Sequence, residues 1–352
     1  MMMKFDLPKE KASVIKVVGV GGGGSNAVNH MYQAGIKGVE FLVCNTDSQA
    51  LNASPVPMKV QLGASLTEGR GAGSLPEMGK NSAIENLDDV KEALGHNTKM
   101  IFITAGMGGG TGTGAAPVIA KLAKEMGMLT VGIVTVPFNF EGKKRQVQAL
   151  KGIEELKSTV DTLLVICNDK LREIHGDLKL TEAFGHADDI LSTAARSIAE
   201  IITVTGYINV DFADVYTVMN SSGVAIMGSA TAEGDDRALT AAKRSLDSPL
   251  LNDNKIVGAR YILLNISSGA QEITMDEIGE ITDFIQNEAG QTADIIMGTG
   301  LDESLDDNIC VTVIATGFQA HEQNSIGEKE PERIVRNLDD DIDDKKEEAI
   351  QT

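Results

Sequence analysis

A glycine run at residues 106–114, GMGGGTGTG, is the feature of this sequence best suited to chemistry. Six of its nine residues are glycine, which costs more backbone entropy than a simple turn requires. Such a run lets backbone N–H groups approach phosphates closely, and the hydroxyls of Thr111 and Thr113 add donors. The N-terminus of the next helix would contribute about half a positive charge. The run therefore predicts a phosphate-binding loop.

A second glycine run, GVGGGG at residues 19–24, fits the pattern GxGxxG between a strand and a helix. By itself this pattern leaves open a Rossmann-type oxidoreductase that uses NAD, with Glu40 as the acid that binds the ribose. The run at residues 106–114 argues against that alternative. Neither run is followed by a lysine in the GK[ST] pattern, which excludes a P-loop.

Two carboxylates three residues apart, Asp211 and Asp214, follow Asn209 in the sequence NVDFAD. Paired carboxylates can orient and polarise an attacking water molecule. Taken in isolation, the same residues also suit an ordinary acidic loop.

Alternating strands and helices are predicted to position the glycine runs. Apolar stretches predict strands, and helical patterns follow two of them. Because this alternation is typical of a doubly wound α/β fold with a parallel sheet, both glycine runs should meet where the carboxyl ends of the strands share one edge. The expected strands are 13–20, 38–47, 99–104, 129–136 and 161–166, and the helices are 26–34 and about 115–126.

A long helix is predicted from residue 181 to about 203, because apolar residues recur there at steps of three and four. It would connect the first domain to a smaller α/β domain with strands at 213–219, 259–269 and 308–318 and helices at 235–246 and 275–286. The expected division is a disordered N-terminal arm (1–12), a nucleotide-binding domain (13–180), the central helix (181–205), a C-terminal domain (206–318) and an acidic disordered tail (319–352).

The composition excludes several functional classes. A net charge of −20 and a pI near 4.6 disfavour nucleic-acid binding, so a bound polyphosphate would need backbone N–H groups, helix N-termini and a metal ion. The widely spaced Cys44, Cys167 and Cys310 suit core positions better than disulfides or zinc. No apolar run approaches the roughly 20 residues that span a bilayer, so a cytoplasmic protein is expected.

Four motifs in order give the chain a specific resemblance: NTDSQAL, TAGMGGGTGTGAAP, PFNFEGKKR and INVDFADV. With them, residues from about 15 to 318 resemble the tubulin/FtsZ family of GTPases. The resemblance implies a tubulin-like fold with a GTP-binding N-terminal domain, a long central helix and a C-terminal domain whose loop completes the neighbouring subunit's active site. It also implies a polymerising, GTP-hydrolysing protein of the bacterial division ring at mid-cell.

The resemblance assigns roles to individual residues. The phosphates would contact Gly22, Gly23, Gly109, Thr111, Gly112 and Thr113, with Gly71, Ala72 and Gly73 closing over them. Glu141 and Arg145 would bind the ribose, while Asn26, Asn168 and Asp188 would read guanine and Phe184 would stack on it. Asp211 and Asp214, with Asn209, would orient the attacking water.

The cofactors implied are GTP and GDP, Mg²⁺ with the nucleotide and K⁺ as a second candidate cation, without a metal site made by the protein. The partners implied are further copies of the chain, membrane adaptors and division regulators. Asp211 follows Asp188 by about 20 residues, or roughly 30 Å of helix, so the two cannot serve one nucleotide within one chain. Head-to-tail association of subunits is therefore expected. A filament that binds GTP without hydrolysing it remains an alternative, against which the two aspartates argue.

Overall fold

A parallel sheet forms the framework of the N-terminal half. The computed structural model describes residues 13–170, 179–203, 208, 210–247 and 256–318, so the predicted arm, the predicted tail and Asn209 lie outside the described residues. Six strands pair in parallel in the order β3-β2-β1-β4-β5-β6. Their bounds are β1 Ile15–Val20, β2 Val39–Asn45, β3 Met58–Gln61, β4 Met100–Gly106, β5 Leu129–Val136 and β6 Thr162–Cys167. The predicted parallel sheet is confirmed.

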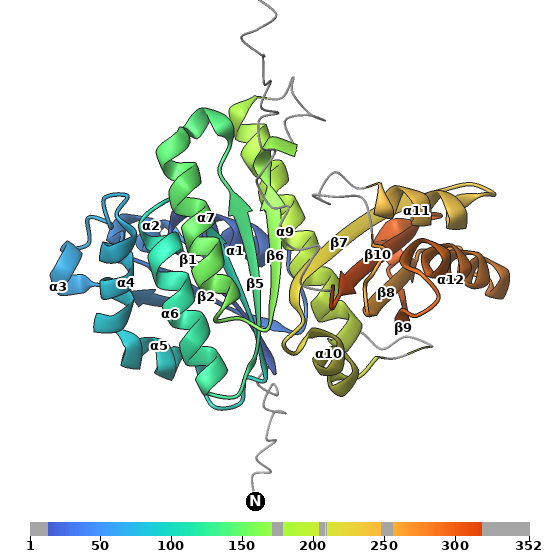
Figure 1. Cartoon of the computed structure of the whole chain (residues 1–352), viewed down its shortest axis with the longest axis horizontal. Helices are drawn as coiled ribbons and strands as arrows, with labels where there is room; N and C mark the ends of the chain where they lie inside the picture. Colours follow the sequence, from blue (N-terminus) through green and yellow to red (C-terminus); the bar gives the residue numbers. More distant parts are fainter. Residues whose placement is uncertain (1–12, 171–178, 204–207, 209, 248–255, 319–352) are drawn as a thin grey trace, which may run out of the picture. The chain divides into compact units, whose positions relative to one another are not determined.

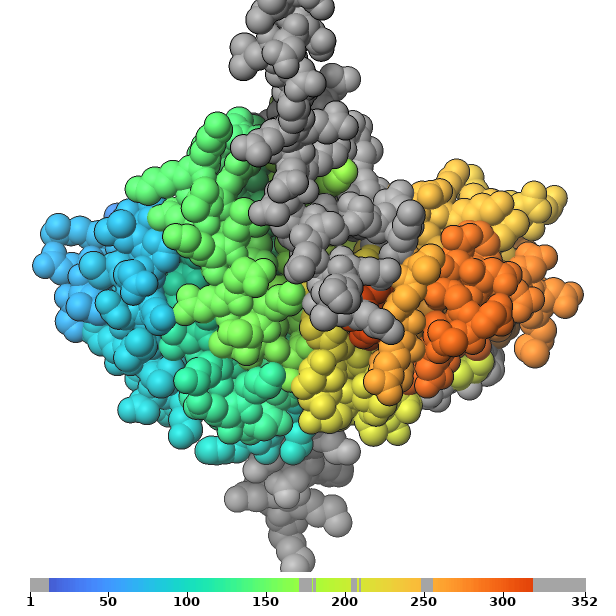
Figure 2. Space-filling model, in the orientation of Figure 1, coloured from blue at the N-terminus to red at the C-terminus, as the bar shows by residue number. Residues whose placement is uncertain are grey.

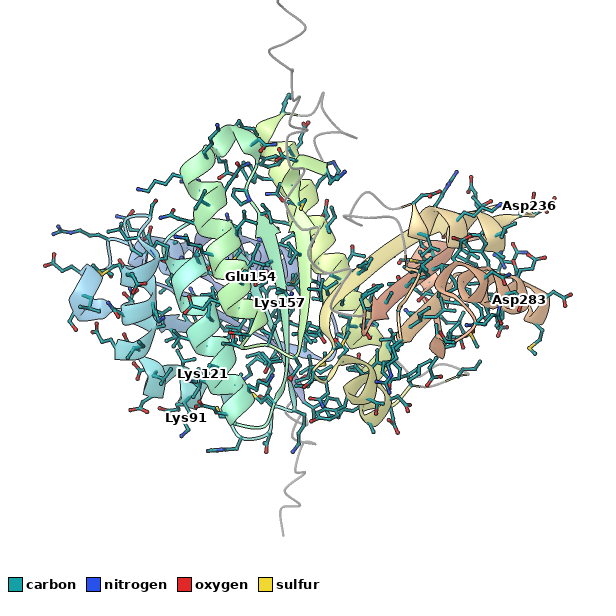
Figure 3. The ribbon with its side chains drawn as sticks, in the orientation of Figure 1. Lys91, Lys121, Glu154, Lys157, Asp236 and Asp283 are labelled. Atoms are coloured by element: carbon teal, nitrogen blue, oxygen red, sulfur yellow. The ribbon has the colours of Figure 1, made fainter. Side chains whose placement is uncertain are left out.

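Helices cover both faces of these strands, which explains why the strands are apolar without alternation; all six residues of β1 are buried. One core contains side chains of α5, α6 and α7, and another contains those of α1 and of the long helix α9 (Leu180–Thr203). Figure 1 shows how these helices lie against the sheet. Charged side chains such as Lys121 and Glu154 project from the outer faces of α6 and α7 (Figure 3). The helices of this half are α1 Gly21–Gln33, α2 Ser48–Ala53, α3 Ala64–Thr67, α4 Pro76–Glu85, α5 Leu87–Leu94, α6 Thr111–Glu125, the 3-10 turn η1 Asn139–Glu141, and α7 Lys143–Lys157.

Both glycine runs are partly helical, which differs from the prediction of loops that precede helices. Helix α1 begins at Gly21 rather than near residue 26, and α6 begins at Thr111 rather than near residue 115. The low helix propensity of glycine suggested a turn, but packing against the sheet outweighs that propensity. As a consequence, the unpaired N–H groups of two helix N-termini fall within the glycine runs themselves.

Helix α9, Leu180–Thr203, connects the two halves through a shared core. Its buried Leu191 and Ile198 belong to the same cluster as Ile314 of β10. The sheet also continues across this junction, because β6 pairs in parallel with β7. The remaining strands add a mixed part in the order β7-β10-β8-β9, so the predicted fold class is confirmed. Their bounds are β7 Gly223–Ala232, β8 Tyr261–Ser268, β9 Asp294–Leu301 and β10 Ile309–Thr316.

The prediction of a strand at residues 213–219 is wrong, since these residues belong to helix α10, Phe212–Met219. Its buried side chains, Val215, Val218 and Met219, recur at helical spacing, and Asp211 caps its N-terminus. The β-branched residues and Tyr216 suggested a strand, but the cap and the tertiary contacts of one face decide for the helix. The C-terminal half also contains α11 Arg237–Leu246, α12 Met275–Ala289 and the turn η2 Glu303–Leu305.

A buried ion pair joins α11 to α12 in the C-terminal half. The side chain of Arg237 is 1% exposed and donates from Nε to Glu277 Oε1 at 2.6 Å and from Nη2 to Glu277 Oε2 at 3.2 Å. Its remaining donors reach the carbonyl oxygens of Gln271, Glu272 and Asp307. These bonds hold the loop before α12 and the turn before β10, and they satisfy the guanidinium, as a buried charge requires.

Candidate nucleotide-binding and catalytic sites

The two glycine runs meet through direct backbone contact. A Cβ atom added to Gly21 would lie 2.7 Å from the backbone nitrogen of Gly112, and one added to Gly23 would lie 3.1 Å from the Cα of Gly106. A larger residue at Gly21 would push the first turn of α1 away from α6, and one at Gly23 would push it away from the end of β4. The convergence that the strand order predicted is therefore achieved through close packing of glycine backbones.

A third loop, residues 71–75, packs against the second glycine run. A Cβ atom on Gly110 would lie 2.8 Å from the Cβ of Ala72 and 2.9 Å from the backbone nitrogen of Leu75. Gly71 and Gly73 have positive φ angles, a backbone conformation that favours glycine and lets the loop turn here. Gln148 of α7 donates to the carbonyl of Ser74 at 3.4 Å, and the surfaces of α4 and α7 adjoin (Figure 2). Three loops thus surround one region at the carboxyl edge of the sheet.

Some glycines of these loops face open space instead. A Cβ atom on Gly22 or Gly109 would meet nothing within 4 Å, and neither residue has a positive φ angle. Neither backbone strain nor packing in the protein therefore requires glycine at these two positions. The open backbone at these positions leaves room for a ligand beside the two helix N-termini, and phosphate oxygens suit such a place.

The Gly22→Ala substitution tests this interpretation. We expect it to weaken GDP binding about tenfold, or about 1.4 kcal/mol, because the new methyl group occupies space that a phosphate would use. The protein should not be destabilised, since alanine favours a helix more than glycine does. Isothermal titration calorimetry and thermal unfolding measure the two effects.

Gly279→Ala is the matched control for that substitution, because Gly279 lies in α12 and its Cβ position is equally open. It should leave GDP binding unchanged. Equal GDP affinity in the Gly22→Ala variant and the native protein would refute the phosphate contact.

The two predicted phosphate-binding threonines are buried and brace the loops. The Oγ1 atoms of Thr111 and Thr46 lie 2.6 Å apart, and Thr113 Oγ1 accepts a hydrogen bond from the backbone N–H of Gly108 at 2.9 Å. These contacts give both hydroxyls a structural role in shaping the glycine run. Their contacts with a phosphate stay predictions. Thr46 was not among the residues predicted from the sequence, although its place directly after β2 was a usable signal.

Helices α1 and α9 carry the residues predicted to read the base. Asn26 is exposed and lies one turn after Gly22 on α1, while Phe184 and Asp188 are one turn apart on α9. The two helices are joined where His30 Nε2 lies 3.0 Å from Asp189 Oδ1. One face of α1 therefore extends from the open glycine Gly22 to the helix that carries Asp188.

Asn168 and Phe184 have environments that suit a purine base. Asn168, directly after β6, is 4% exposed, and its Oδ1 has no hydrogen-bond partner among the described residues. Phe184 is 40% exposed and contacts the buried Phe138 edge-on, with 5.4 Å between ring centroids. An unpaired buried amide oxygen and an exposed ring are what a base with N–H donors and a flat face can satisfy.

The predicted ribose pair is already engaged within the protein. Glu141 Oε2 accepts a hydrogen bond from Arg145 Nη1 at 2.7 Å, and Glu141 Oε1 accepts one from the backbone N–H of Phe138 at 3.0 Å. Glu141 thus fixes the turn that places Phe138 beside Phe184. Its contact with a ribose hydroxyl remains a prediction.

The predicted catalytic aspartates form the N-terminal cap of α10. Asp211 Oδ1 accepts hydrogen bonds from the backbone N–H groups of Ala213 at 2.8 Å and Asp214 at 2.9 Å. In return, Asp214 Oδ2 accepts from the N–H of Asp211 at 3.1 Å. This reciprocal capping box gives both carboxylates a structural role and holds them at the surface in fixed geometry.

The aspartates and the glycine runs lie at opposite ends of the strands of the parallel sheet. Thr162, the first residue of β6, donates to the carbonyl of Met219 at the end of α10 and pairs with Gly223 of β7. The glycine runs follow the carboxyl ends of β1 and β4. In Figure 1, α10 lies at the other end of the strands, away from the start of α9. Six residues of β6 alone span about 20 Å. One chain cannot bring both sets to the same phosphate.

The described residues contain no cluster of three or more His, Cys, Asp or Glu side chains suited to a metal ion. They also contain no helix long and apolar enough to cross a membrane.

Comparisons with known proteins identify the family. Residues 14–176 match the model of the Tubulin/FtsZ family, GTPase domain, and residues 223–319 match that of the FtsZ family, C-terminal domain. An FtsZ dimer from M. jannaschii is 41% identical, with 87% of this chain and 88% of that chain covered and a TM-score of 0.82. A CetZ2 protofilament from Haloferax volcanii with bound GTPγS shares the fold at 22% identity, with 87% of this chain and 93% of that chain covered and a TM-score of 0.75.

These matches exclude the NAD-dependent oxidoreductase considered above and account for both glycine runs through one GTPase domain. The domain signatures lie on the two halves of the fold, on either side of α9. The chain belongs to the FtsZ family of tubulin-like GTPases.

Proposed function

We propose that this FtsZ-family GTPase assembles head to tail and hydrolyses GTP at the contact between successive subunits, as the polymer of a cell-division ring. The observation that carries the proposal is that the glycine runs lie at one end of the strands of the sheet, whereas Asp211 and Asp214 lie at the other end. A second copy that presents its α10 edge to the nucleotide of the first would complete the site. The M. jannaschii FtsZ dimer and the H. volcanii CetZ2 protofilament are relatives in which subunits associate.

In this proposal each group has one task. Backbone N–H groups of the glycine runs bind the phosphates, and the α1 and α6 N-termini stabilise negative charge on the γ-phosphate. Asp211 and Asp214 of the next subunit, with Asn209, orient the attacking water and polarise it. Mg²⁺ would neutralise phosphate charge, and since the described residues offer no metal cluster, phosphates and water must supply most of its ligands, with K⁺ a further candidate.

The concentration dependence of turnover tests the shared site. Phosphate release from GTP is measured in Mg²⁺ and potassium buffer over a range of protein concentrations, alongside light scattering. We expect specific activity near zero below a threshold and a rise above it together with scattering. Specific activity that is constant over the whole range would show a site complete within one chain.

The role in cell division is a further part of the proposal. At 41% identity the chain is closer to the M. jannaschii FtsZ than to the CetZ2 structure at 22%, which supports a division role. We expect a fluorescent fusion to form a cytoplasmic ring at mid-cell, where membrane adaptors and division regulators would bind it. A uniform or polar distribution in dividing cells would contradict this role.

Nucleotide affinity should depend on pH through Asp188. Partial burial raises the pKa of this carboxyl to about 6. Guanine presents N–H donors, which only the ionised carboxylate accepts through both oxygens, so GDP affinity should fall about tenfold between pH 7.5 and 5. The folding stability of the free protein has the opposite pH dependence. The raised pKa of Asp188 adds stability at low pH, and this stability is lost as the pH rises through about 6. Calorimetric titration with GDP across this range measures the effect, and a flat profile would argue against Asp188 as the base reader.

A further inference from the structure

A small cluster of two histidines and one aspartate joins α1 to α9 beside the proposed base site. His30 Nε2 from the last turn of α1 lies 3.0 Å from Asp189 Oδ1 on α9. On α9 itself, His186 Nδ1 lies 3.6 Å from Asp189 Oδ2. Each of these side chains is between 41% and 52% exposed, so the cluster lies at the surface and does not belong to the core.

This cluster lies where the two helices that carry base-reading residues meet. His30 follows Asn26 by four residues, which is one helical turn. Asp189 directly follows Asp188, which in turn lies one turn after Phe184. A bond between His30 and Asp189 therefore ties the turn of α1 that follows Asn26 to the turn of α9 that carries Asp188.

We propose that the His30–Asp189 pair is a positioning device that holds the Asp188 carboxylate against guanine and so sets the preference of the site for guanine nucleotides. This inference rests on the proposed role of Asp188 as the base reader. Asn26, Asp188 and Phe184 contact the base in that proposal, whereas His30 and Asp189 act through them. Discrimination follows from geometry, because a carboxylate that loses its place leaves a guanine donor unpaired, which is costly at a partly buried site.

The same pair also acts on the charge of Asp188. Burial raises the pKa of Asp188, the neighbouring charge of Asp189 raises it further, and the charge of His30 lowers it. The charged groups that face Asp188 are thus His30 from α1 and Asp189 on α9, where His186 shares Asp189. The positioning role and the charge role therefore predict separate results.

Substitutions at His30 and Asp189 separate the effect of the hydrogen bond between these two side chains from the effect of their charges. His30→Ala removes both, whereas His30→Gln keeps an N–H donor for Asp189 without the positive charge. Asp189→Asn keeps an acceptor for His30 without the negative charge. His186→Ala is the matched control, because His186 contacts Asp189 from the same helix.

The experiment is a set of dissociation constants for GDP and for inosine diphosphate, which lacks the exocyclic amino group of guanine, between pH 5 and 8. At pH 7.5 we expect His30→Ala to reduce the preference for GDP about tenfold and His30→Gln to restore it. The fall in GDP affinity on acidification should occur at higher pH in His30→Gln, and at lower pH in Asp189→Asn, than in the native protein. His186→Ala should retain the native preference.

The outcomes distinguish this inference from the proposed function. The inference would be overturned if the His30 and Asp189 variants kept both the native preference for GDP over inosine diphosphate and the native pH dependence of GDP affinity. Asp188→Asn is measured in parallel: if it too keeps the native preference for GDP, the base-reading role of Asp188 is wrong. If Asp188→Asn loses the preference while His30→Ala keeps it, only the positioning role fails. Thermal unfolding of each variant shows that the fold is retained.

Discussion

Asp211→Asn is expected to reduce GTP turnover at least about 100-fold while leaving the affinity for GTP unchanged. Asparagine caps a helix as well as aspartate does, so the hydrogen bonds from Ala213 and Asp214 to Oδ1 can be kept. The substitution removes only the negative charge that would orient and polarise the attacking water. Asp211→Ala is a poorer test, since it also removes a cap that is worth about 1 kcal/mol. Steady-state phosphate release and equilibrium GTP binding measure the two quantities.

Mixing two inactive variants tests whether the Asp211 effect acts between subunits. In Asp211→Asn subunits the glycine runs are intact, and in Gly109→Val subunits the aspartates are intact. A head-to-tail contact between the two kinds places a native α10 edge against a native nucleotide site, so mixtures should recover part of the activity that each lacks alone. Phosphate release that stays at the sum of the separate variants would show that Asp211 serves its own chain's nucleotide.

Arg237→Ala is expected to lower the free energy of unfolding by about 3–5 kcal/mol, because it leaves the Glu277 carboxylate without its main partner in a partly buried position. Three carbonyl oxygens lose a donor in the same step. Denaturant unfolding followed by circular dichroism measures the loss. The Arg237 guanidinium also holds the pKa of Glu277 below its usual range. This contribution to stability is present above the unfolded carboxyl pKa and disappears as the pH falls through the folded value.

The Arg237→Ala, Glu277→Ala double variant separates the pair from its surroundings. Because it removes both charges, it should be less destabilised than the sum of the two single variants. Lys80→Ala is a surface control, since Lys80 pairs with Glu155 while 38% exposed and should cost less than about 1 kcal/mol. A loss of similar size for Arg237→Ala and Lys80→Ala would contradict the account of the buried pair.

The sequence was most informative where a local pattern had one physical cause. Two glycine runs after apolar strands predicted that the runs meet at the carboxyl ends of a parallel sheet, and the central helix was predicted within one residue of its start at Leu180. It was least informative at residues 213–219, where β-branched and aromatic residues suggested a strand. Propensity is a weak guide there, because the Asp211 cap and the burial of Val215, Val218 and Met219 decide for α10.

The sequence by itself determined the residue types available for chemistry: the glycines, the threonine hydroxyls and the aspartates. Only the tertiary structure decided what those groups do. It assigned Gly21 and Gly112 to backbone packing, left Gly22 and Gly109 open, and brought His30 to Asp189 across two helices. It also placed Asp211 at the edge of the sheet opposite the glycine runs. The physical reason is that spacing along a chain fixes which residues share one helix or strand, whereas distances between elements depend on how their buried faces pack.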